Sequence, residues 1–163
     1  MTDNEWEEQV NIYNHLTKKE QKWINPNPTY DRPSKCLILY NKINEYGFIC
    51  AYQYTYNSDY VGFEIAVKKQ YRNNHLASKW IFEMIVFLLQ RGYTKFMTCV
   101  NDYNLPSKHI IRDKFGFKKY SYDGHLGYYH LTIENGSDFI ANKFLFMCSS
   151  NNTNSANKKR IKR

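Results

Sequence analysis

The sequence predicts an α+β fold, in which helices flank a mixed, mostly antiparallel sheet with a β-α-β unit at its centre. Three runs rich in aromatic and β-branched residues follow one another with short turns between them, which is typical of an antiparallel meander. The third run leads into a long apolar helical stretch, and a further strand run comes after it. Because a strand-helix-strand connection brings its two strands parallel, we expect the sheet to be mixed.

The first predicted element is an amphipathic helix within Glu5 to Ile24, on which apolar residues recur at helical spacing. These residues are Trp6, Val10, Tyr13 and Leu16. The segment "INPNPTYDRPS" (24–34) comes next, and its prolines mark an irregular connection because proline cannot continue a helix. The stretch before it is too short to fold alone, so we place no domain boundary there.

The meander consists of strands over Lys35 to Tyr40, Gly47 to Tyr56 and Tyr60 to Val67, joined by turns at "NKINEY" and "NSD". From His75 to Arg91 the residues are nearly all apolar apart from one narrow polar stripe. That pattern predicts a helix buried against the sheet, with Gly92 as its C-cap.

The chain continues with a strand from Thr94 to Val100 and a second helix over 105–115, "LPSKHIIRDKF". Asn104 is a natural N-cap for that helix, and Pro106 is allowed in its first turn. The runs "GFKKYSY" and "YYHLTI" around "DGHLG" then form a hairpin. The predicted order is therefore α, β-β-β, α, β, α, β-β.

A chain of 163 residues fits one domain, which we place at residues 1–148, followed by a disordered Asn- and Ser-rich tail at 149–163. The net charge is +8, but five positive charges lie in the tail and the body carries only about +3. These five are Lys158, Lys159, Arg160, Lys162 and Arg163. A mildly basic body and a tail without aromatic residues predict at most weak contact with nucleic acid, made through the tail.

The sequence indicates neither a membrane span nor a metal site. The longest apolar run of the long helix, Met84 to Leu89, is far shorter than the roughly 20 residues that a bilayer needs. The acidic start "MTDNEWEEQ" does not resemble a signal peptide, so we expect a cytoplasmic protein. The cysteines lack CxxC or His-Cys spacing, so we expect reduced and mostly buried thiols. They are Cys36, Cys50, Cys99 and Cys148.

The segment "YRNNHLAS", which joins the third strand to the long helix, is the candidate anion site. A helix start after a tight loop presents unpaired backbone N–H groups at the positive end of the helix dipole. Arg72 stands beside these groups, and the small Ala77 and Ser78 leave room for an anion. The alternative is purely structural: Asn73 or Asn74 caps the helix, and Arg72 is a solvated surface charge.

This segment resembles the best-known motif of the GNAT superfamily of acyl-CoA-dependent N-acyltransferases, Arg/Gln-x-x-Gly-x-Gly/Ala after a strand ending in Val. Val67, Arg72 and Ala77 match the motif. His75 stands where the family usually has glycine, so its side chain must point away from the phosphates or face them.

A second segment, "NLPSKHIIRDKFGFKKY", resembles the family's later pattern of Asn-x-x-Ser/Ala, a helix, and Gly-Phe. The matching residues are Asn104, Ser107, Gly116 and Phe117. The helix between Ser107 and Gly116 is one residue longer than is commonest in the family.

The resemblance implies a GNAT-like fold with acetyl-CoA as co-substrate, in a cleft where the two parallel strands splay apart. It places the pyrophosphate on the backbone N–H groups of the helix start, the pantetheine arm along the strand edge, and Asn104 and Ser107 near the thiol. The implied binding residues are Ile65, Ala66, Val67, Arg72, Asn73, Asn74, His75, Leu76, Ala77, Asn104 and Ser107. The implied reaction is direct transfer of an acetyl or other short acyl group to a primary amine.

Acyl transfer to an amine needs a neutral amine, donors for the oxyanion, and an acid for the leaving thiolate. Glu64 in "GFEIAV" is the candidate base, unless it lies on a solvent-exposed face. Many relatives use as acid a tyrosine four residues before Gly-Phe, a place that holds Arg112 here, or Ile111 if the register shifts. Tyr103, Tyr120, Tyr122 and Tyr128 are nearby in sequence and His109 lies on the helix itself; among them we take Tyr120 as the candidate acid.

A second function is open at this stage, namely a catalytically weak or inactive GNAT-like protein that binds nucleic acid or protein through its basic surface and tail. The missing tyrosine and His75 favour it, whereas Arg72, Ala77 and Asn104 favour a working acyl-CoA site. No motif specifies the acceptor, which the sequence leaves open between a small amine, a protein and an aminoacyl-tRNA.

Overall fold

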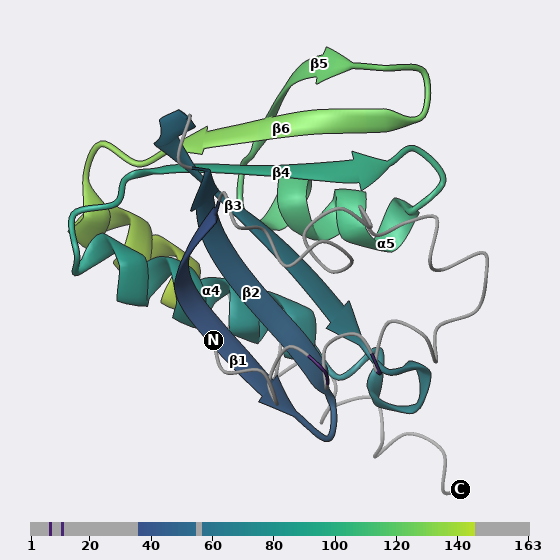
Figure 1. Ribbon diagram of the computed structural model, residues 1–163. Coiled ribbons are helices and arrows are strands. Elements are labelled where there is room, and N and C mark those ends of the chain that lie inside the picture. The colour runs from purple at the N-terminus through teal and green to yellow at the C-terminus, as the bar shows by residue number, and fades with distance from the viewer. Residues whose placement is uncertain (1–6, 8–10, 12–35, 55–56, 146–163) are drawn as a thin grey trace, which may run out of the picture.

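The structure is a computed structural model that describes residues 36–54 and 57–145, together with residues 7 and 11. Within these residues, six strands form one sheet in the order β1-β2-β3-β4-β6-β5, and the helices of this part of the chain lie on one face of it (Figure 1). The α+β architecture is therefore as predicted. The predicted helix from Glu5 to Ile24 lies outside the described residues except for residues 7 and 11, which are helical, and the tail at 149–163 lies outside them entirely.

Strands β1 (Cys36–Asn44), β2 (Gly47–Tyr54) and β3 (Asn57–Val67) form the predicted antiparallel meander. Both predicted turns were wrong in extent. "NKINEY" is mostly strand, because β1 runs on to Asn44 and only two residues turn the chain into β2. "NSD" belongs to β3.

A side-chain hydrogen bond and a glycine stabilise the tight turn between β1 and β2. The Asn44 side-chain oxygen accepts a hydrogen bond from the Tyr46 N–H at 3.0 Å. Gly47 has a φ of 149°, and a Cβ at this position would collide with the carbonyl oxygen of Ala66 on β3. The close approach of two backbones thus requires glycine here.

The helix α4 (Leu76–Leu89) and the strand β4 (Lys95–Asn101) complete the predicted β-α-β unit. β3 and β4 are parallel, as expected. The turn after α4 uses Gly92 at a φ of 85°, and the Tyr93 N–H closes the helix on the Leu88 carbonyl at 3.1 Å. Gly92 therefore acts as the predicted C-cap glycine.

The main hydrophobic core lies between the sheet and the helices. α4 contributes five side chains that are at most 2% exposed, which is why its sequence is apolar on most sides. They are Trp80, Ile81, Met84, Ile85 and Leu88. Within the described residues, no helix is long and apolar enough to cross a membrane.

The second helix begins as predicted and then changes its winding. α5 (Leu105–Lys108) starts at Asn104, whose side-chain oxygen accepts from the Ser107 N–H at 3.3 Å. The chain then continues as a π-helical segment, η2 (His109–Lys114). The wider turn is visible in the bond from the Phe115 N–H to the carbonyl oxygen five residues earlier, at 3.1 Å.

This π-helical segment accommodates the residue that lengthens the helix relative to the common family pattern. A π-turn holds one residue more than an α-turn of the same length, so the residues after the turn keep their place. Phe115 and Phe117 are buried at 2% and 1% exposure, and Gly116 between them has a φ of 79°. The Gly-Phe step thus reaches the core despite the insertion.

Strands β5 (Lys118–Tyr122) and β6 (Leu126–Thr132) form the predicted hairpin, with β6 between β4 and β5. Residues 136–145 form a helix that was not predicted from the sequence. Asn135 begins it by accepting from the Asp138 N–H at 3.1 Å, and Phe139 packs against the core. The Asn-Gly-Ser-Asp start was the signal that could have revealed it.

Deletion of Arg112, an exposed residue of η2, should be tolerated. It turns an i,i+5 hydrogen bond into the i,i+4 bond of an α-helix, so we expect the free energy of unfolding to change by less than about 1 kcal/mol. Deletion of the exposed Lys79 is the control and should cost more than about 3 kcal/mol, because it rotates the following buried residues of α4 away from the sheet. Urea denaturation measures both, and equal losses would contradict the expectation.

Candidate active site

The candidate site is a cavity of about 280 Å³ at the place where β3 and β4 separate. The two strands pair only at Val61 with Phe96 and at Gly62 with Met97. Just beyond, the Thr98 hydroxyl donates to the Phe63 carbonyl at 3.3 Å, and no further pairing of these two strands is present. The cavity is lined from both faces of the sheet as a result.

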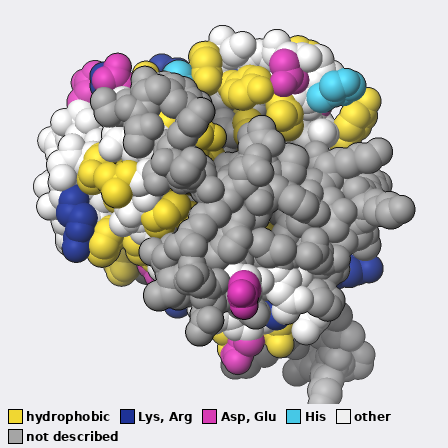
Figure 2. Space-filling model, in the orientation of Figure 1, with side chains coloured by type: hydrophobic (Ala, Val, Ile, Leu, Met, Phe, Trp, Pro, Cys, Tyr) yellow, Lys and Arg dark blue, Asp and Glu magenta, His cyan; other side chains and the backbone are white. Residues whose placement is uncertain are grey.

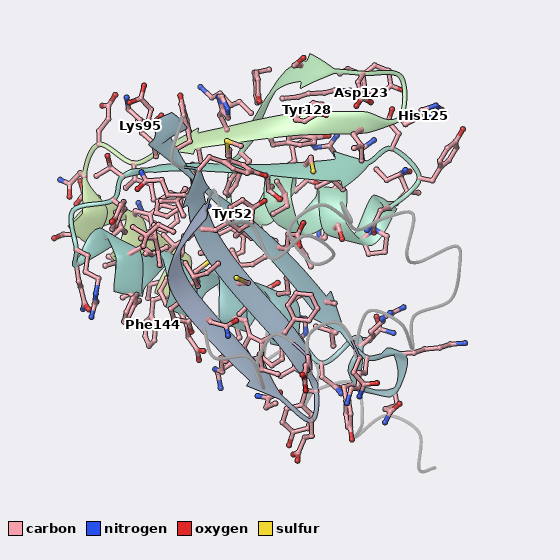
Figure 3. All side chains as sticks on the ribbon, in the orientation of Figure 1. Tyr52, Lys95, Asp123, His125, Tyr128 and Phe144 are labelled. Atoms are coloured by element: carbon pink, nitrogen blue, oxygen red, sulfur yellow. The ribbon has the colours of Figure 1, made fainter. Side chains whose placement is uncertain are left out.

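The helix-side wall of the cavity comes mainly from α4, α5 and η2. Its residues include Ala77, Ile81, Ser107, Ile110 and Ile111. The opposite wall carries residues that alternate with the core positions along each strand, so they face away from α4. They include Tyr52, Tyr54, Glu64, Cys99, Tyr120 and Tyr128. Figure 3 shows Tyr52 and Tyr128 on separate strands of this part of the sheet.

Six of the residues singled out from the sequence line this cavity. They are Glu64, Ile65, Ala77, Asn104, Ser107 and Tyr120. The remaining ones form the strand end and the loop beside it. They are Ala66, Val67, Arg72, Asn73, Asn74, His75 and Leu76. Ala66 does not face the cavity, since it is 5% exposed and packs with Phe48 and Cys50.

The end of β3 presents one backbone edge to the cleft. β2 pairs with the other edge, through Ile49 with Ile65 and Gly47 with Val67. On the side facing β4, the described residues contain no strand partner for β3 beyond Gly62. An edge of this kind can hydrogen-bond an extended amide-containing ligand.

The start of α4 has the geometry of an anion site. Its first backbone bond runs from the Lys79 N–H to the His75 carbonyl at 3.0 Å, so the N–H groups of Leu76, Ala77 and Ser78 have no acceptor within the helix. Asn73 just before has a φ of 65°. These N–H groups lie at the positive end of the helix dipole.

His75 adopts a backbone conformation that favours glycine. Its φ is 58°, in the left-handed region that glycine enters most easily and that histidine tolerates better than most other residues. The His75 side chain is exposed and makes no capping hydrogen bond. The His75 side chain therefore points away from the backbone N–H groups at the start of α4.

Arg72 joins this loop to the end of β3. Its Nε donates to the Val67 carbonyl oxygen at 2.9 Å, and the side chain is half-buried. The guanidinium charge therefore lies where the strand ends and before the helix begins. This location adds a fixed positive charge to the backbone anion site.

Glu64 is the one carboxylate among the described residues that line the cavity. The residue is 8% exposed, and its Oε1 has no hydrogen-bond partner in the described part of the chain. Burial raises the pKa of Glu64 well above its usual value, because the ionised form is deprived of water. Glu64 thus does not lie on a solvent-exposed face, and it has the raised basicity that a proton acceptor needs.

The two residues at the family's tyrosine position cannot serve as the acid. Arg112 is exposed and paired with Asp113, with Nε and Oδ1 2.6 Å apart. Ile111 is 3% exposed and presents hydrocarbon to the cavity. Neither residue offers a proton donor to the cavity.

Tyr120 on β5 is held at the cavity by a stack of rings. The centres of the Tyr120 and His130 rings are 3.5 Å apart, and the centres of the His130 and Tyr60 rings are 4.1 Å apart. Both pairs are stacked. Within the described residues, the Tyr120 hydroxyl makes no hydrogen bond. Burial raises the pKa of Tyr120, so the hydroxyl stays protonated through neutral pH.

Two other aromatic residues of the cavity, Tyr52 and Tyr54, were not identified from the sequence, and Tyr128, one of the tyrosines considered for the acid, lines it as well. The Tyr52 ring packs against Gly62 of β3, where an added Cβ would approach it to 2.8 Å. The Tyr128 hydroxyl donates to Asp123 at 3.0 Å. The alternation of "YQYTY" on β2 was the signal that could have identified the first two, since it sets Tyr52 and Tyr54 on the same face.

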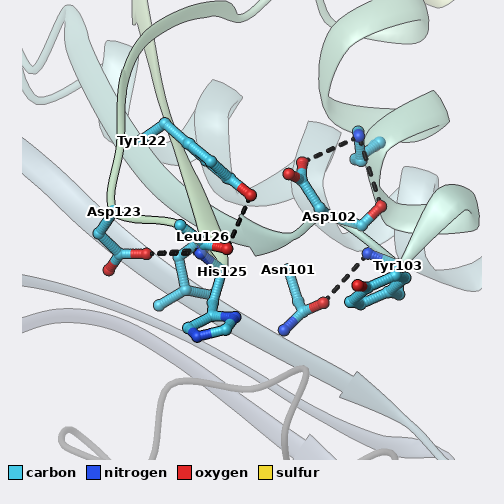
Figure 4. A network of polar contacts seen from close by, with 9 residues as sticks. Asn101, Asp102, Tyr103, Tyr122, Asp123, His125 and Leu126 are labelled. Carbon is cyan, nitrogen blue, oxygen red and sulfur yellow. Dashed lines mark hydrogen bonds and ion pairs between the residues drawn. The ribbon is translucent and has the colours of Figure 1, made fainter.

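Polar contacts organise the loops at the rim of the cavity (Figure 4). Asp123 accepts hydrogen bonds from the backbone N–H groups of His125 and Leu126, at 3.0 and 2.8 Å. Asp102 pairs with Lys108 of α5 at 3.1 Å. These bonds fix the β5–β6 turn and the connection from β4 to α5. Among the described residues, no group of three His, Cys, Asp or Glu side chains could hold a metal ion.

Comparisons with known proteins identify the family. The profile of the acetyltransferase (GNAT) family matches residues 1–117. No curated protein matches the chain by sequence. Since the family profile covers well over half of the sequence, the chain belongs to the acetyltransferase (GNAT) family.

Solved structures agree on the fold. The GNAT domain of the S. lividans protein PAT is similar with a TM-score of 0.62 and 12% identity, covering 82% of this chain and 88% of its own. An N-acetyltransferase of Thermoplasma acidophilum, solved in complex with coenzyme A, has a TM-score of 0.60 and 12% identity over 82% and 96%. The chain spans only 59% of an N-acetyltransferase of Staphylococcus aureus, with 22% identity over 53% of this chain and a TM-score of 0.45.

Replacing His75 should reveal the cost of its backbone conformation. We expect His75→Gly to be more stable than His75→Ala by about 1 kcal/mol, because alanine carries a Cβ into the left-handed region and glycine does not. Lys79, which is helical, is the control, and there alanine should be the more stable by about 1 kcal/mol. Chemical denaturation of the four variants measures both differences. The same order at both positions would contradict the left-handed geometry of His75.

The burial of Glu64 should make stability depend on pH. Because the folded-state pKa is raised, the folded protein binds more protons than the unfolded chain at pH values between the two pKa values. The wild type should therefore lose stability relative to Glu64→Gln as the pH rises through that interval, by about 1.4 kcal/mol per pH unit. Urea denaturation of both proteins from pH 4 to 8 measures this. A difference that stays constant across the range would show that Glu64 is not desolvated.

Proposed function

We propose that this protein is an acetyl-CoA-dependent N-acetyltransferase that transfers an acetyl or other short acyl group directly to a primary amine. The observation that carries the proposal is the buried Glu64, which lies in a cavity at the divergence of β3 and β4, close to the helix start that can bind an anion. Membership of the GNAT family supports it, as does the fold shared with an N-acetyltransferase solved with coenzyme A.

In the proposed binding mode, the backbone N–H groups from Arg72 to Ala77 hold the pyrophosphate, and Arg72 adds charge. The exposed His75 leaves those groups accessible. The edge of β3 from Ile65 to Val67 pairs with the amides of the pantetheine arm. Asn104 and Ser107 lie near the thioester end, because both line the cavity.

In the proposed reaction, Glu64 accepts one proton from the incoming ammonium group and so frees the nitrogen lone pair. The neutral amine attacks the thioester carbon, forming the C–N bond as the C–S bond breaks. Tyr120 gives its proton to the leaving thiolate, and the second proton of the nitrogen restores Tyr120. The proton on Glu64 passes to solvent, which completes the cycle.

Calorimetric titration with acetyl-CoA tests the binding proposal. We expect the wild type to bind and Arg72→Ala to bind at least about tenfold more weakly, because a charge-assisted contact to phosphate is lost. Arg91→Ala is the matched control, because Arg91 is an exposed cation at the other end of α4. Its removal should leave the affinity for acetyl-CoA unchanged. No binding by the wild type, or equal losses in the two variants, would overturn the binding mode.

Release of the CoA thiol in the presence of amines tests the catalytic roles. Glu64→Gln and Tyr120→Phe should each lower kcat/KM by roughly a hundredfold or more while acetyl-CoA still binds. Undiminished turnover in either variant would remove that residue from the mechanism. If acetyl-CoA binds but no amine is acylated, the alternative of an inactive binding protein is favoured.

A further inference from the structure

We propose that the cavity wall opposite α4 is an acceptor subsite for a compact, singly charged primary amine with an apolar body and no anionic group. This deepens the proposed function by naming its substrate class, and it rests on that function. The inference rests on the charge and the aromatic rings of this wall and not on the residues proposed to bind acyl-CoA.

The charge of the lining favours a cationic ligand. Glu64 is the only carboxylate among the described lining residues, and these residues include no lysine, arginine or histidine. A buried carboxylate oxygen without a partner needs a cation or a proton. A bound ammonium group satisfies this need, whereas an anionic substrate would meet an uncompensated like charge.

The aromatic content of the same wall favours a cation attached to an apolar body. Four tyrosines from three strands surround this part of the cavity, namely Tyr52, Tyr54, Tyr120 and Tyr128. They form two edge-to-face pairs, with ring centres 5.3 Å apart on β2 and 6.2 Å apart on the β5–β6 hairpin. Ring faces beside a carboxylate attract a cation, and they accept an apolar body at the same time.

The size of the cavity limits the acceptor. A cavity of about 280 Å³ is slightly smaller than the range typical of small-molecule sites, and the acyl group must share it. Tyr52 is only 6% exposed, and its ring is in close contact with Gly62. The ring therefore cannot move toward β3, and this wall does not widen easily. A compact acceptor is therefore favoured over a bulky one.

The rim of the subsite fits the same class of ligand. Figure 2 shows hydrophobic side chains gathered over the β5–β6 hairpin, and Tyr120 and Tyr122 there are 52% and 48% exposed. An apolar rim can receive the part of the acceptor that projects beyond the cavity. The described rim thus offers rings to the ligand, in keeping with the wall inside.

Calorimetry with three molecules of one skeleton tests the proposal, in the presence of CoA. Phenylalaninol carries the ammonium group, phenylalanine adds a carboxylate, and 3-phenylpropan-1-ol lacks the amine. We expect phenylalaninol to bind at least about tenfold more tightly than either of the others, because a like charge or a missing cation each leaves Glu64 unsatisfied. Equal binding of phenylalanine and phenylalaninol would overturn the proposal.

Variants assign the effect to this wall. Glu64→Gln should remove the preference for phenylalaninol over phenylalanine. Tyr128→Leu should weaken phenylalaninol at least about threefold, whereas Tyr128→Phe retains a ring and should keep most of the affinity. Tyr103→Leu is the matched control, since Tyr103 is 79% exposed and does not line the cavity. A preference that survives in Glu64→Gln would overturn the assignment.

The outcomes separate this inference from the function on which it rests. The same titrations are repeated without CoA, and acetyl-CoA binding is measured on its own, so failure of the acyl-CoA site is recognised independently of failure of the amine subsite. Acylation of an aminoacyl-tRNA with no binding of the small amines would leave acyl transfer intact and overturn the proposed substrate class.

Discussion

The site depends on how soon β3 and β4 stop pairing. Two adjacent parallel strands would ordinarily satisfy each other's backbone groups along their length, but these two do so at only two positions. Beyond Gly62 and Met97 the strands diverge, and the cavity lies in the gap between them. The long buried helix α4 fixes the geometry, because its apolar face holds β3 while its first turn points toward the same gap. The free edge of β3, the accessible start of α4 and the cavity therefore all follow from the early end of pairing between β3 and β4.

The interruption also explains the chemistry available to Glu64. A residue facing away from α4 on an ordinary strand would meet solvent or a second layer, yet Glu64 is buried beside a cavity lined largely by rings. Its raised pKa is the direct result of that environment, and the same environment favours a cation as its partner. The raised pKa of Glu64 and the proposed selectivity for a cationic acceptor thus have a common physical origin in desolvation. The tyrosines serve both, because they exclude water and offer ring faces.

Much of this could be predicted from the sequence, and the features that could not be predicted have identifiable reasons. The β-α-β unit, the hairpins and the capping roles of Asn104 and Gly92 are encoded in local patterns, and the structure confirms them. Turn lengths were wrong because "NKINEY" has turn-forming residues that pair as strand once β2 lies alongside. Tyr52 and Tyr54 were missed because, although their shared face on β2 is encoded locally, their meeting with Tyr120 in one cavity depends on the order of the strands. The outward placement of His75 became clear only from the exposure of its side chain, which the surrounding fold determines.

The π-helical segment η2 bears on how such a chain can change over generations. An added residue in a regular helix turns everything after it through about a quarter of a revolution, and the buried pattern is lost unless compensating changes arise with it. Here the disturbance is confined to a single widened turn, and Phe117 still reaches the core. A helix with such a turn can therefore take up an added residue without losing the buried positions that follow it.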